Sequence, residues 1–215
     1  IISPWNYPLT TPITSVVQAL LAGNNIVLKP SEHTPLSTLY IKELWDKHIG
    51  YKDAFNIVLG DSRVGKILVE SNKIDMICFT GSTKVGKIIA KTCAETLKPV
   101  ILELGGKDPL IVLKDADLKR AVESSLFAGF SNAGQTCISV EDVFVENVVF
   151  EKYVNIITKR VESMSSGNDD AMEIGSMIME PNCNKVREYI DEIDDKNIIV
   201  AGNSIDHKMY IAPTL

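Results

Sequence analysis

Short apolar runs alternate with amphipathic segments through the first hundred residues, and this alternation restricts the fold more than any other feature. Three runs have strand character and a helical pattern follows each, in the order 24–30, 34–50, 55–60, 62–73, 75–81 and 82–96. A strand–helix repeat with almost continuously apolar strands is typical of a parallel sheet covered by helices on both faces. We therefore expect an α/β fold.

Local signals support the first helix of this series. Thr34 is a candidate N-cap, Pro35 occupies the first helical position, and Gly50 can close the helix. A further extended segment is expected over 98–106, ending in a double glycine.

The sequence pattern changes after that double glycine, and we place a domain boundary there, with one domain over 1–106 and a second over 107–215. The elements expected in the second domain are strands at 107–113, 142–147, 197–202 and 209–215, helices at 116–132, 150–164 and about 181–195, and a polar loop at 165–173.

Composition excludes several classes of protein. The 215 residues are 45% hydrophobic, enough for a sizeable core, and the net charge is −6 without a basic patch, so we expect neither nucleic-acid nor membrane partners. The four cysteines lack CxxC spacing, which argues against a disulfide framework or a metal site and favours a reducing cytoplasm. Both ends of the sequence are interpreted as cut, so we expect a fragment of a longer protein.

One cysteine stands in an unusual context. Cys137 follows Asn132, Gly134, Gln135 and Thr136 in the segment FSNAGQTCIS (130–139), which has the polarity of an exposed turn, whereas a structural cysteine usually lies in an apolar run. The segment alone leaves two interpretations open, a nucleophile and an inert thiol, because thiolate chemistry also needs an activating environment.

Three segments that follow strands have the residue types of a nucleotide site. Ser82 in FTGSTKVG (79–86) opens a helix, whose N-terminus suits a phosphate, although it can be an ordinary N-cap. In LGDSRVG (59–65), Gly60 and Gly65 bracket another strand-to-helix turn, which is a weak signal because Ser62 takes the middle position of a GxGxxG motif. In LKPSE (28–32), the Glu32 carboxylate can accept hydrogen bonds from a ribose diol and Lys29 can add a donor, or both can belong to a solvated loop.

Two further residues are candidates for chemistry. Glu103 lies between leucines in LELGGK (102–107), and an apolar neighbourhood would raise its pKa toward that of a general base, although an outward-facing strand residue is the commoner case. Asn6 lies between prolines on an irregular segment, ISPWNYP (2–8), where a rigid amide can donate to an oxyanion or serve only as a loop residue.

Taken together and in this order, the segments resemble the aldehyde dehydrogenase superfamily. The resemblance rests on PWNYP, GNNIVLKPSEHTP, FTGSTKVG, LELGGKDP and NAGQTC, and it covers the chain from residue 1 to about 150. The tail to 215 is similar to the catalytic domain of the family, and CISVEDVFVE resembles a subset that includes succinate-semialdehyde dehydrogenase-like enzymes. The resemblance implies part of a Rossmann-like NAD(P)-binding domain followed by part of an α/β catalytic domain.

The resemblance also implies roles for individual residues. Cys137 is the nucleophile, Glu103 the general base, and Asn6 an oxyanion donor together with the backbone N–H of Cys137. The residues implied in cofactor binding are Trp5, Lys29, Glu32, Gly60, Thr80, Gly81, Ser82, Val85, Leu104 and Gly105. The implied substrate is a small aldehyde, the implied cofactor is NAD with NADP as an alternative, and the full-length protein is expected to be a homo-oligomer, a dimer or tetramer.

Two departures from the pattern of the family limit these inferences. The turn at 60–65 carries Ser62 and is one residue tighter than in many relatives, which leaves the seating of the cofactor open. The downstream Glu-x-Phe-Gly-Pro motif that holds the nicotinamide ribose in the family is missing, so the segment alone is expected to be inactive.

Three alternatives stay open. A coenzyme A-acylating relative would resolve the thioester with a thiol and would not need Glu103. A non-catalytic binding or structural protein on the same scaffold would tend to lose the cysteine or the glutamate. A cysteine hydrolase would need a histidine beside the thiol, and the pattern around His33, His48 and His207 does not suggest one.

Overall fold

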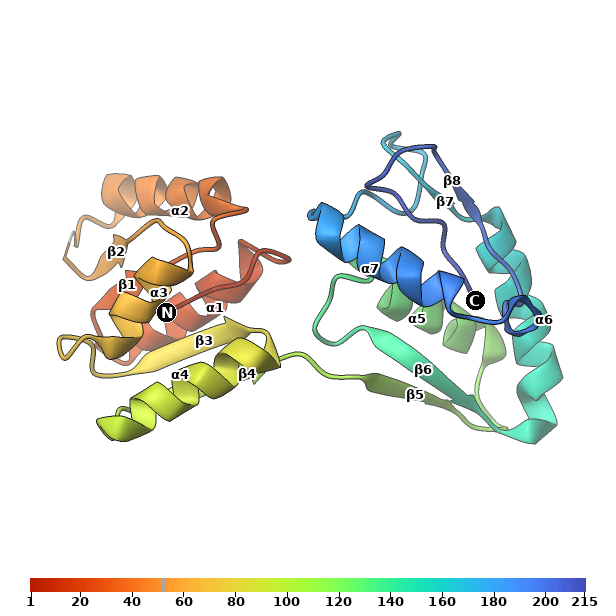
Figure 1. Cartoon of the computed structure of the whole chain (residues 1–215), viewed down its shortest axis with the longest axis horizontal. Helices are drawn as coiled ribbons and strands as arrows, with labels where there is room; N and C mark the ends of the chain where they lie inside the picture. Colours follow the sequence, from red (N-terminus) through yellow and green to blue (C-terminus); the bar gives the residue numbers. More distant parts are fainter. Residues whose placement is uncertain (52) are drawn as a thin grey trace. The chain divides into compact units, whose positions relative to one another are not determined.

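The computed structural model describes residues 1–51 and 53–215, which form two compact units, Ile1–Gly105 and Gly106–Leu215 (Figure 1). The division lies one residue from the boundary expected after residue 106. The residues at the division, 105–107, belong to neither a strand nor a helix. Each unit has its own sheet pairing and its own hydrophobic core.

The first unit is built on a parallel sheet. Its strands are β1 (Ile26–Leu28), β2 (Phe55–Ile57), β3 (Ile77–Gly81) and β4 (Val100–Leu104). β1 pairs with β2 and β3 pairs with β4, both in parallel. Ile2 joins the two pairs, because it forms parallel bridges to Lys29 and to Phe79. The order across the sheet is therefore β2, β1, residues 1–3, β3, β4, which is the doubly wound order of a Rossmann-like fold.

Backbone hydrogen bonds on both sides hold this central segment. Ile2 donates to the carbonyl of Cys78 (2.8 Å) and accepts from the N–H of Thr80 (3.1 Å). On the other side, Ser3 donates to the carbonyl of Lys29 (3.0 Å). Residues 1–3 are thus the middle strand of the sheet.

The sequence interpretation misses two elements here. The pattern predicts an irregular segment over 2–8 and no helix before residue 24, whereas residues 1–3 lie in the sheet and α1 spans Thr10–Leu21. Three residues are too few to show a period of two, and α1 buries only Pro12 and Val16, so its apolar face is weakly marked.

Two layers of helices cover the sheet. The other helices of this unit are α2 (Pro35–His48), α3 (Ser62–Glu70) and α4 (Thr83–Glu95). The core that includes α1 and α2 contains Val16, Ile26, Leu28, Phe55, Ile41 and Trp45. The core that includes α3 and α4 contains Ile2, Val69, Ile77, Phe79, Ile89 and Cys93. The chain therefore covers one face of the sheet with α1 and α2 and the other face with α3 and α4.

The ends of α2 confirm two of three local predictions. Pro35 is at the start of the helix, and Gly50, with φ of +81°, follows its end. The Thr34 side chain makes no cap hydrogen bond, because its Oγ1 donates instead to the carbonyl of Trp5 (3.5 Å).

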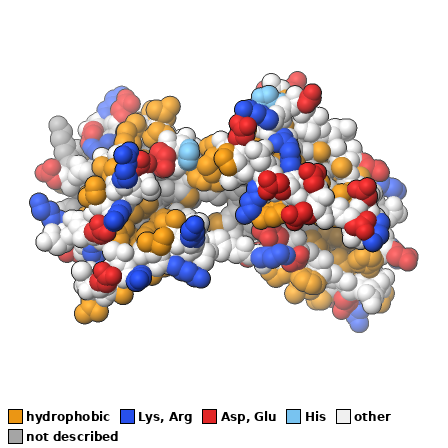
Figure 2. Space-filling model, viewed as in Figure 1, with side chains coloured by type: hydrophobic (Ala, Val, Ile, Leu, Met, Phe, Trp, Pro, Cys, Tyr) orange, Lys and Arg blue, Asp and Glu red, His pale blue; other side chains and the backbone are white. Residues whose placement is uncertain are grey.

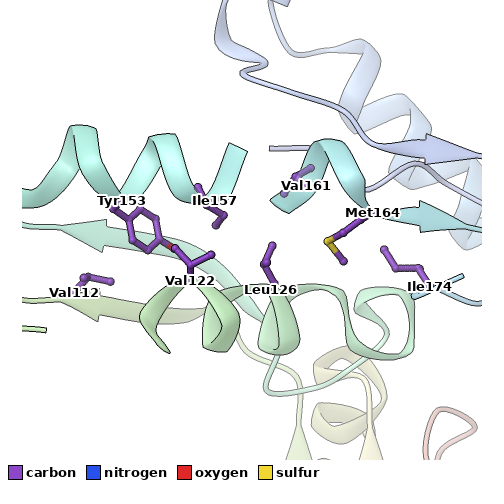
Figure 3. Close-up of a cluster of buried hydrophobic side chains, with 8 residues drawn as sticks. All are labelled: Val112, Val122, Leu126, Tyr153, Ile157, Val161, Met164 and Ile174. Carbon is purple, nitrogen blue, oxygen red and sulfur yellow. The ribbon is translucent and has the colours of Figure 1, made fainter. Parts of the chain in front are cut away.

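The second unit is also α/β. Its elements are β5 (Asp108–Val112), α5 (Leu118–Phe130), the 3₁₀ turn Ser131–Gly134, β6 (Val140–Val145), α6 (Asn147–Ser163), β7 (Ser165–Ser166), α7 (Glu180–Asp191), the 3₁₀ turn Asp195–Asn197 and β8 (Asn203–Ser204). β5 pairs with β6 in parallel, and β7 with β8. The core packs α5 and α6 on β5, through Val112, Val122, Leu126, Tyr153, Ile157, Val161, Met164 and Ile174 (Figure 3).

The C-terminal predictions are partly wrong. The strands expected at 197–202 and 209–215 reduce to one antiparallel bridge between Ala201 and Thr214. Pro213 is the next position of this pairing, where its carbonyl accepts from the N–H of Gly202 (2.8 Å), but it has no N–H to donate in return, so the ladder cannot extend through it. The loop expected at 165–173 begins with β7.

The surface carries charges of both signs. Figure 2 shows acidic and basic side chains interspersed on each unit. Every helix in the described part of the chain is too short or too polar to cross a membrane.

Candidate active site

The carboxyl ends of the parallel strands define one edge of the first sheet, and the residues implied in cofactor binding follow these ends. Trp5 follows the central segment, Lys29 follows β1, Gly60 follows β2, Ser82 follows β3 and Gly105 follows β4. The strand order reverses between residues 1–3 and β3, and ligands of doubly wound sheets bind outside the strand ends at this reversal.

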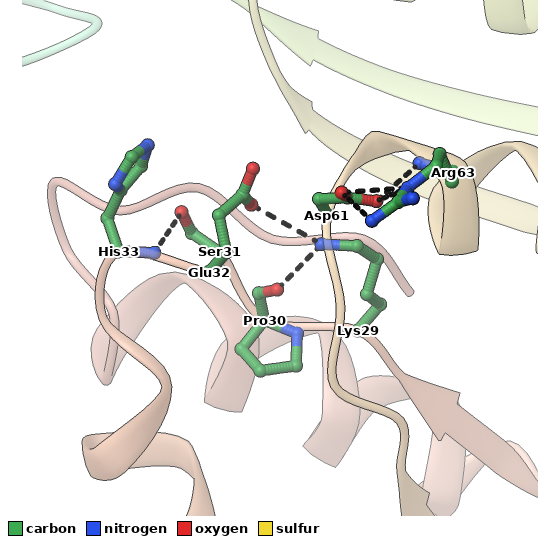
Figure 4. A network of polar contacts seen from close by, with 7 residues as sticks. All are labelled: Lys29, Pro30, Ser31, Glu32, His33, Asp61 and Arg63. Atoms are coloured by element: carbon green, nitrogen blue, oxygen red, sulfur yellow. Dashed lines mark hydrogen bonds and ion pairs between the residues drawn. The ribbon is translucent and has the colours of Figure 1, made fainter.

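A buried lysine lies at the end of β1 (Figure 4). Lys29 is only 4% exposed, and its Nζ donates to the carbonyl of Pro30 (2.9 Å) and lies 3.6 Å from Oε2 of Glu32. A Cβ on Gly65 would lie 3.8 Å from Cδ of Lys29, so the lysine stem lies against the first turn of α3. This packing holds the amine beside the exposed carboxylate of Glu32.

The turn between β2 and α3 requires a glycine at position 60. Gly60 has φ of +148°, and a Cβ there would lie 2.3 Å from Cγ2 of Val64. Asp61 caps α3 by accepting from the N–H of Arg63 (2.9 Å), and the Arg63 side chain lies 2.8 Å from the same carboxylate. These hydrogen bonds from Arg63 hold the pKa of Asp61 below its usual value. Ser62 is the first residue of α3, directly after the Asp61 cap.

The N-terminus of α4 follows β3 directly. Ser82 is its N-cap and accepts from the N–H of Val85 through Oγ (3.3 Å). A Cβ on Gly86 would lie 2.6 Å from Leu104, so this glycine lets α4 approach the end of β4 closely. Ser82 and Val85 are both exposed, so the helix N-terminus is open to a ligand.

Two threonines at the start of α2, Thr34 just before the helix and Thr38 within it, hold the turn that contains Trp5 and Asn6. Thr34 donates to the carbonyl of Trp5 (3.5 Å) and Thr38 donates to the carbonyl of Pro8 (3.3 Å). Asn6 is half-buried between these two ties.

Glu103 occupies an exposed position in its own unit. It pairs with Thr80 across β3 and β4, so the two side chains share a face of the sheet, opposite to the face that carries Leu102 and Leu104 into the core. Of the two interpretations that the sequence leaves open, the structure supports the outward-facing strand residue, because strand alternation directs the flanking leucines to the other face.

Cys137 lies in the second unit, on an irregular turn between α5 and β6. Its side chain is exposed, as its polar neighbours predict. Asn132, Ala133 and Gly134 all have left-handed backbone conformations, with φ of 54°, 58° and 72°. No hydrogen bond from the Cys137 N–H to another described residue is recorded, so this donor is available to a ligand.

Burial distinguishes Cys137 from two of the other thiols. Cys93 and Cys183 are buried, and burial raises the pKa of each thiol above its usual value. Cys78 is half-buried and lies 3.7 Å from Ser15 Oγ. Cys137 is thus the most accessible cysteine of the four.

Sequence reasoning treats Gln135 only as one polar residue of the turn. In the structure its side chain joins two segments, because Nε2 donates to the carbonyl of Asn132 (2.8 Å) and Oε1 accepts from the N–H of Ile178 (3.0 Å). The Thr34 and Thr38 ties are also unexpected. No sequence signal identifies these contacts, because each joins residues through a backbone atom that any residue type would supply.

The residues of the first unit fit a bound dinucleotide. An open helix N-terminus suits a pyrophosphate, and the Lys29–Glu32 pair offers a donor and an acceptor to a ribose. Gly60 and Gly86 have no side chain, so the backbone at these two positions stays free of side-chain bulk.

A doubly wound sheet with these residues along one edge, followed by an α/β unit with an exposed cysteine, defines the class of fold. The sequence model of the aldehyde dehydrogenase family matches residues 1–215. The betaine aldehyde dehydrogenase of Vibrio vulnificus (strain CMCP6) and the succinate semialdehyde dehydrogenase of Acinetobacter baylyi are each 36% identical to the chain, over 223 and 220 residues. The chain therefore belongs to the aldehyde dehydrogenase family, as the motifs predict.

Solved structures agree with this assignment. A crystal structure of an E. coli NADP-dependent enzyme matches with a TM-score of 0.93 at 34% identity, and E. coli lactaldehyde dehydrogenase with 0.91 at 32%. Each match covers 99% of this chain, which confirms the expected fold class. The chain spans about half the length of its relatives, since the two sequence matches cover 100% of it but 46% of each relative.

Proposed function

We propose that this chain is part of an NAD(P)-dependent aldehyde dehydrogenase in which Cys137 is the nucleophile. The observation that carries the proposal is the exposed thiol of Cys137 after a left-handed turn, beside a backbone N–H that donates to none of the residues that the structure describes. A thiol in this setting can reach a substrate, and the N–H can donate to an oxygen that becomes charged when the thiolate attacks.

The proposed reaction begins with attack of the Cys137 thiolate on the aldehyde carbon. The carbonyl oxygen becomes the oxyanion of a thiohemiacetal, which the N–H of Cys137 and the amide of Asn6 stabilise by donating hydrogen bonds. Loss of one such donor typically costs about 10²–10³ in rate. The ties from Thr34 and Thr38 support this role, because they hold the turn that carries Asn6.

The nicotinamide cofactor supplies the hydride acceptor when it is bound. Lys29 and Glu32 hold its adenine ribose, and Ser82 with the N-terminus of α4 meets its pyrophosphate. Val85 and Gly60 line the adenine cleft, whereas Trp5, Thr80, Gly81, Leu104 and Gly105 complete the site. The first unit is thus the cofactor-binding part and the second the thiol-bearing part.

Glu103 acts in the second half of the reaction. After oxidation, Cys137 carries a thioester, and Glu103 accepts a proton from the water that attacks it and releases the carboxylic acid. The exposure of Glu103 is compatible with this role, since a general base must reach water.

The proposed substrate is an aldehyde, and no charge is assigned to the rest of the substrate molecule. The relatives are named for betaine aldehyde, which is cationic, and succinate semialdehyde, which is anionic, so their names point to no common charge. The full-length protein is proposed to be a homo-oligomer, as the resemblance implies.

The test is Cys137→Ser in the full-length protein, assayed by cofactor reduction against a panel of aldehydes. Turnover should fall by about 10³-fold or more, as when other covalent nucleophiles are removed, with cofactor binding preserved in calorimetry. Cys78→Ala is the matched control and should keep wild-type turnover. Retention of more than about one tenth of the rate in Cys137→Ser would contradict the assignment.

A further inference from the structure

The turn before Cys137 is strained. A left-handed conformation is unfavourable for a non-glycine residue, and such residues usually occur singly. Here Asn132 and Ala133 both adopt it, followed by Gly134. A conformation of this kind persists only where surrounding contacts hold it.

Gln135 supplies contacts of this kind from within the turn. Its backbone N–H and its Nε2 both donate to the carbonyl of Asn132, at 3.2 Å and 2.8 Å. The Asn132 side chain returns a bond to the carbonyl of Gln135 (3.3 Å). The two residues therefore close the turn on itself.

The other end of the Gln135 side chain is anchored outside the turn. Oε1 accepts from the N–H of Ile178, in the segment that leads into α7. The neighbouring Met177 is buried, and its N–H donates to the carbonyl of Met209 (2.8 Å). Arg187 on α7 in turn donates to the carbonyls of Lys208 and Tyr210, at 2.8 Å and 3.1 Å. The segment that carries Ile178 is thus itself held by hydrogen bonds to other parts of the second unit.

We propose that Gln135 is a positioning residue, whose carboxamide locks the strained turn to the segment before α7 and so fixes the place of the Cys137 thiol and N–H. The inference rests on the proposed function, because it takes Cys137 as the nucleophile. The hydrogen bonds of the Gln135 side chain to Asn132 and Ile178, here called the clamp, lie within the second unit and can be measured without turnover.

The experiment compares Gln135 variants of the full-length protein in two measurements. Gln135→Met keeps the size of the side chain and removes both hydrogen bonds, whereas Gln135→Glu keeps an acceptor for Ile178 but opposes an oxygen to the carbonyl of Asn132. Gln135→Asn, one methylene shorter, is the second variant if Gln135→Met fails to fold. The measurements are steady-state kinetics and amide hydrogen exchange by mass spectrometry.

The expected result is local. In Gln135→Met, exchange accelerates about tenfold or more in peptides covering 132–140 and 174–180 and stays unchanged in α6. The value of kcat falls roughly 10²-fold, the scale of a misplaced reacting group, with an unchanged KM for the cofactor. Gln135→Glu lowers kcat while peptide 174–180 keeps its protection.

The control separates positioning from stability. Val161→Ala removes buried side-chain volume on α6, in the same unit but outside the turn sequence, and should lower the melting temperature with kcat unchanged. Wild-type kcat in Gln135→Met would overturn the proposal, as would faster exchange spread equally over α6. If Cys137→Ser stays active, the proposed function fails, whereas exchange confined to the two peptides still supports the clamp.

Discussion

The amine of Lys29 lies 3.6 Å from the carboxylate of Glu32, and the lysine stem lies against Gly65 in the first turn of α3. The two residues of this pair have opposite preferences for the group at the 2′ position of a bound ribose. The carboxylate favours a free diol and repels a 2′-phosphate, whereas the amine attracts the phosphate.

We predict that the full-length enzyme prefers NAD and that Glu32→Gln weakens the preference. Removing the negative charge should raise kcat/KM for NADP relative to NAD by about tenfold, which corresponds to about 1.4 kcal/mol. Glu43→Gln makes the same exchange on the exposed surface of α2 and should leave the ratio unchanged. A wild-type enzyme that is more efficient with NADP would show that Lys29 outweighs Glu32.

A second prediction concerns Glu103. Glu103→Gln should slow release of the acid more than hydride transfer, because the amide cannot accept a proton from water. Rapid mixing should show a burst of reduced cofactor that survives while steady turnover collapses. Since Glu103 is exposed, the melting temperature should change little. Loss of the burst together with turnover would instead assign Glu103 a structural role.

The two glycines that flank the start of α3 should respond in opposite directions. Gly60→Ala introduces a Cβ 2.3 Å from Val64 at a φ of +148°, so it should destabilise the protein by about 1–3 kcal/mol. Gly65→Ala meets only Lys29 at 3.8 Å and improves helix propensity, so it should be neutral or stabilising by up to about 1 kcal/mol. Urea unfolding of both variants checks the prediction, and equal losses would contradict it.

Tyr153 should contribute to the stability of the second unit in a pH-dependent way. Burial raises the pKa of its hydroxyl, and the hydrogen bond to Ser125 (2.7 Å) partly opposes this shift. The unfolded chain therefore loses this proton first, at a pH of about 10, so the contribution is complete below that pH and is lost as the pH rises through the folded pKa.

The measurement is urea unfolding of the wild type and Tyr153→Phe at neutral and alkaline pH. The variant should be about 1 kcal/mol less stable at neutral pH, because Ser125 loses a donor, and the gap should narrow above pH of about 10. A difference in unfolding free energy that widens with pH would contradict the prediction.

The fold was predictable where the signal is local. Ser82 caps α4 as the order strand, serine and helix indicates, and polar neighbours predicted the exposure of Cys137. The central strand at 1–3 was not predictable, because its partners at Lys29 and Phe79 are distant in sequence.

Parts of the candidate site depend on backbone geometry that letters do not encode. Alanine as a residue type does not indicate the left-handed backbone conformation of Ala133, which its surroundings impose. Likewise, the leucines beside Glu103 suggest an apolar setting, but strand alternation separates them from it. The C-terminal segment 209–215 resembles a strand, but Pro213 interrupts the pairing.

The central segment also has a consequence for the order of folding events. The pairs β1–β2 and β3–β4 each close across a single helix, and so does the contact of Ile2 with Lys29, whereas the contact of Ile2 with Phe79 joins one end of the first unit to β3. Contacts between distant residues close more slowly, because more chain entropy is lost before they form. Docking of residues 1–3 is thus expected to be the late event that turns two independent strand pairs into one cooperative sheet, and pulsed amide exchange would detect it as late protection of Ile2 and Thr80.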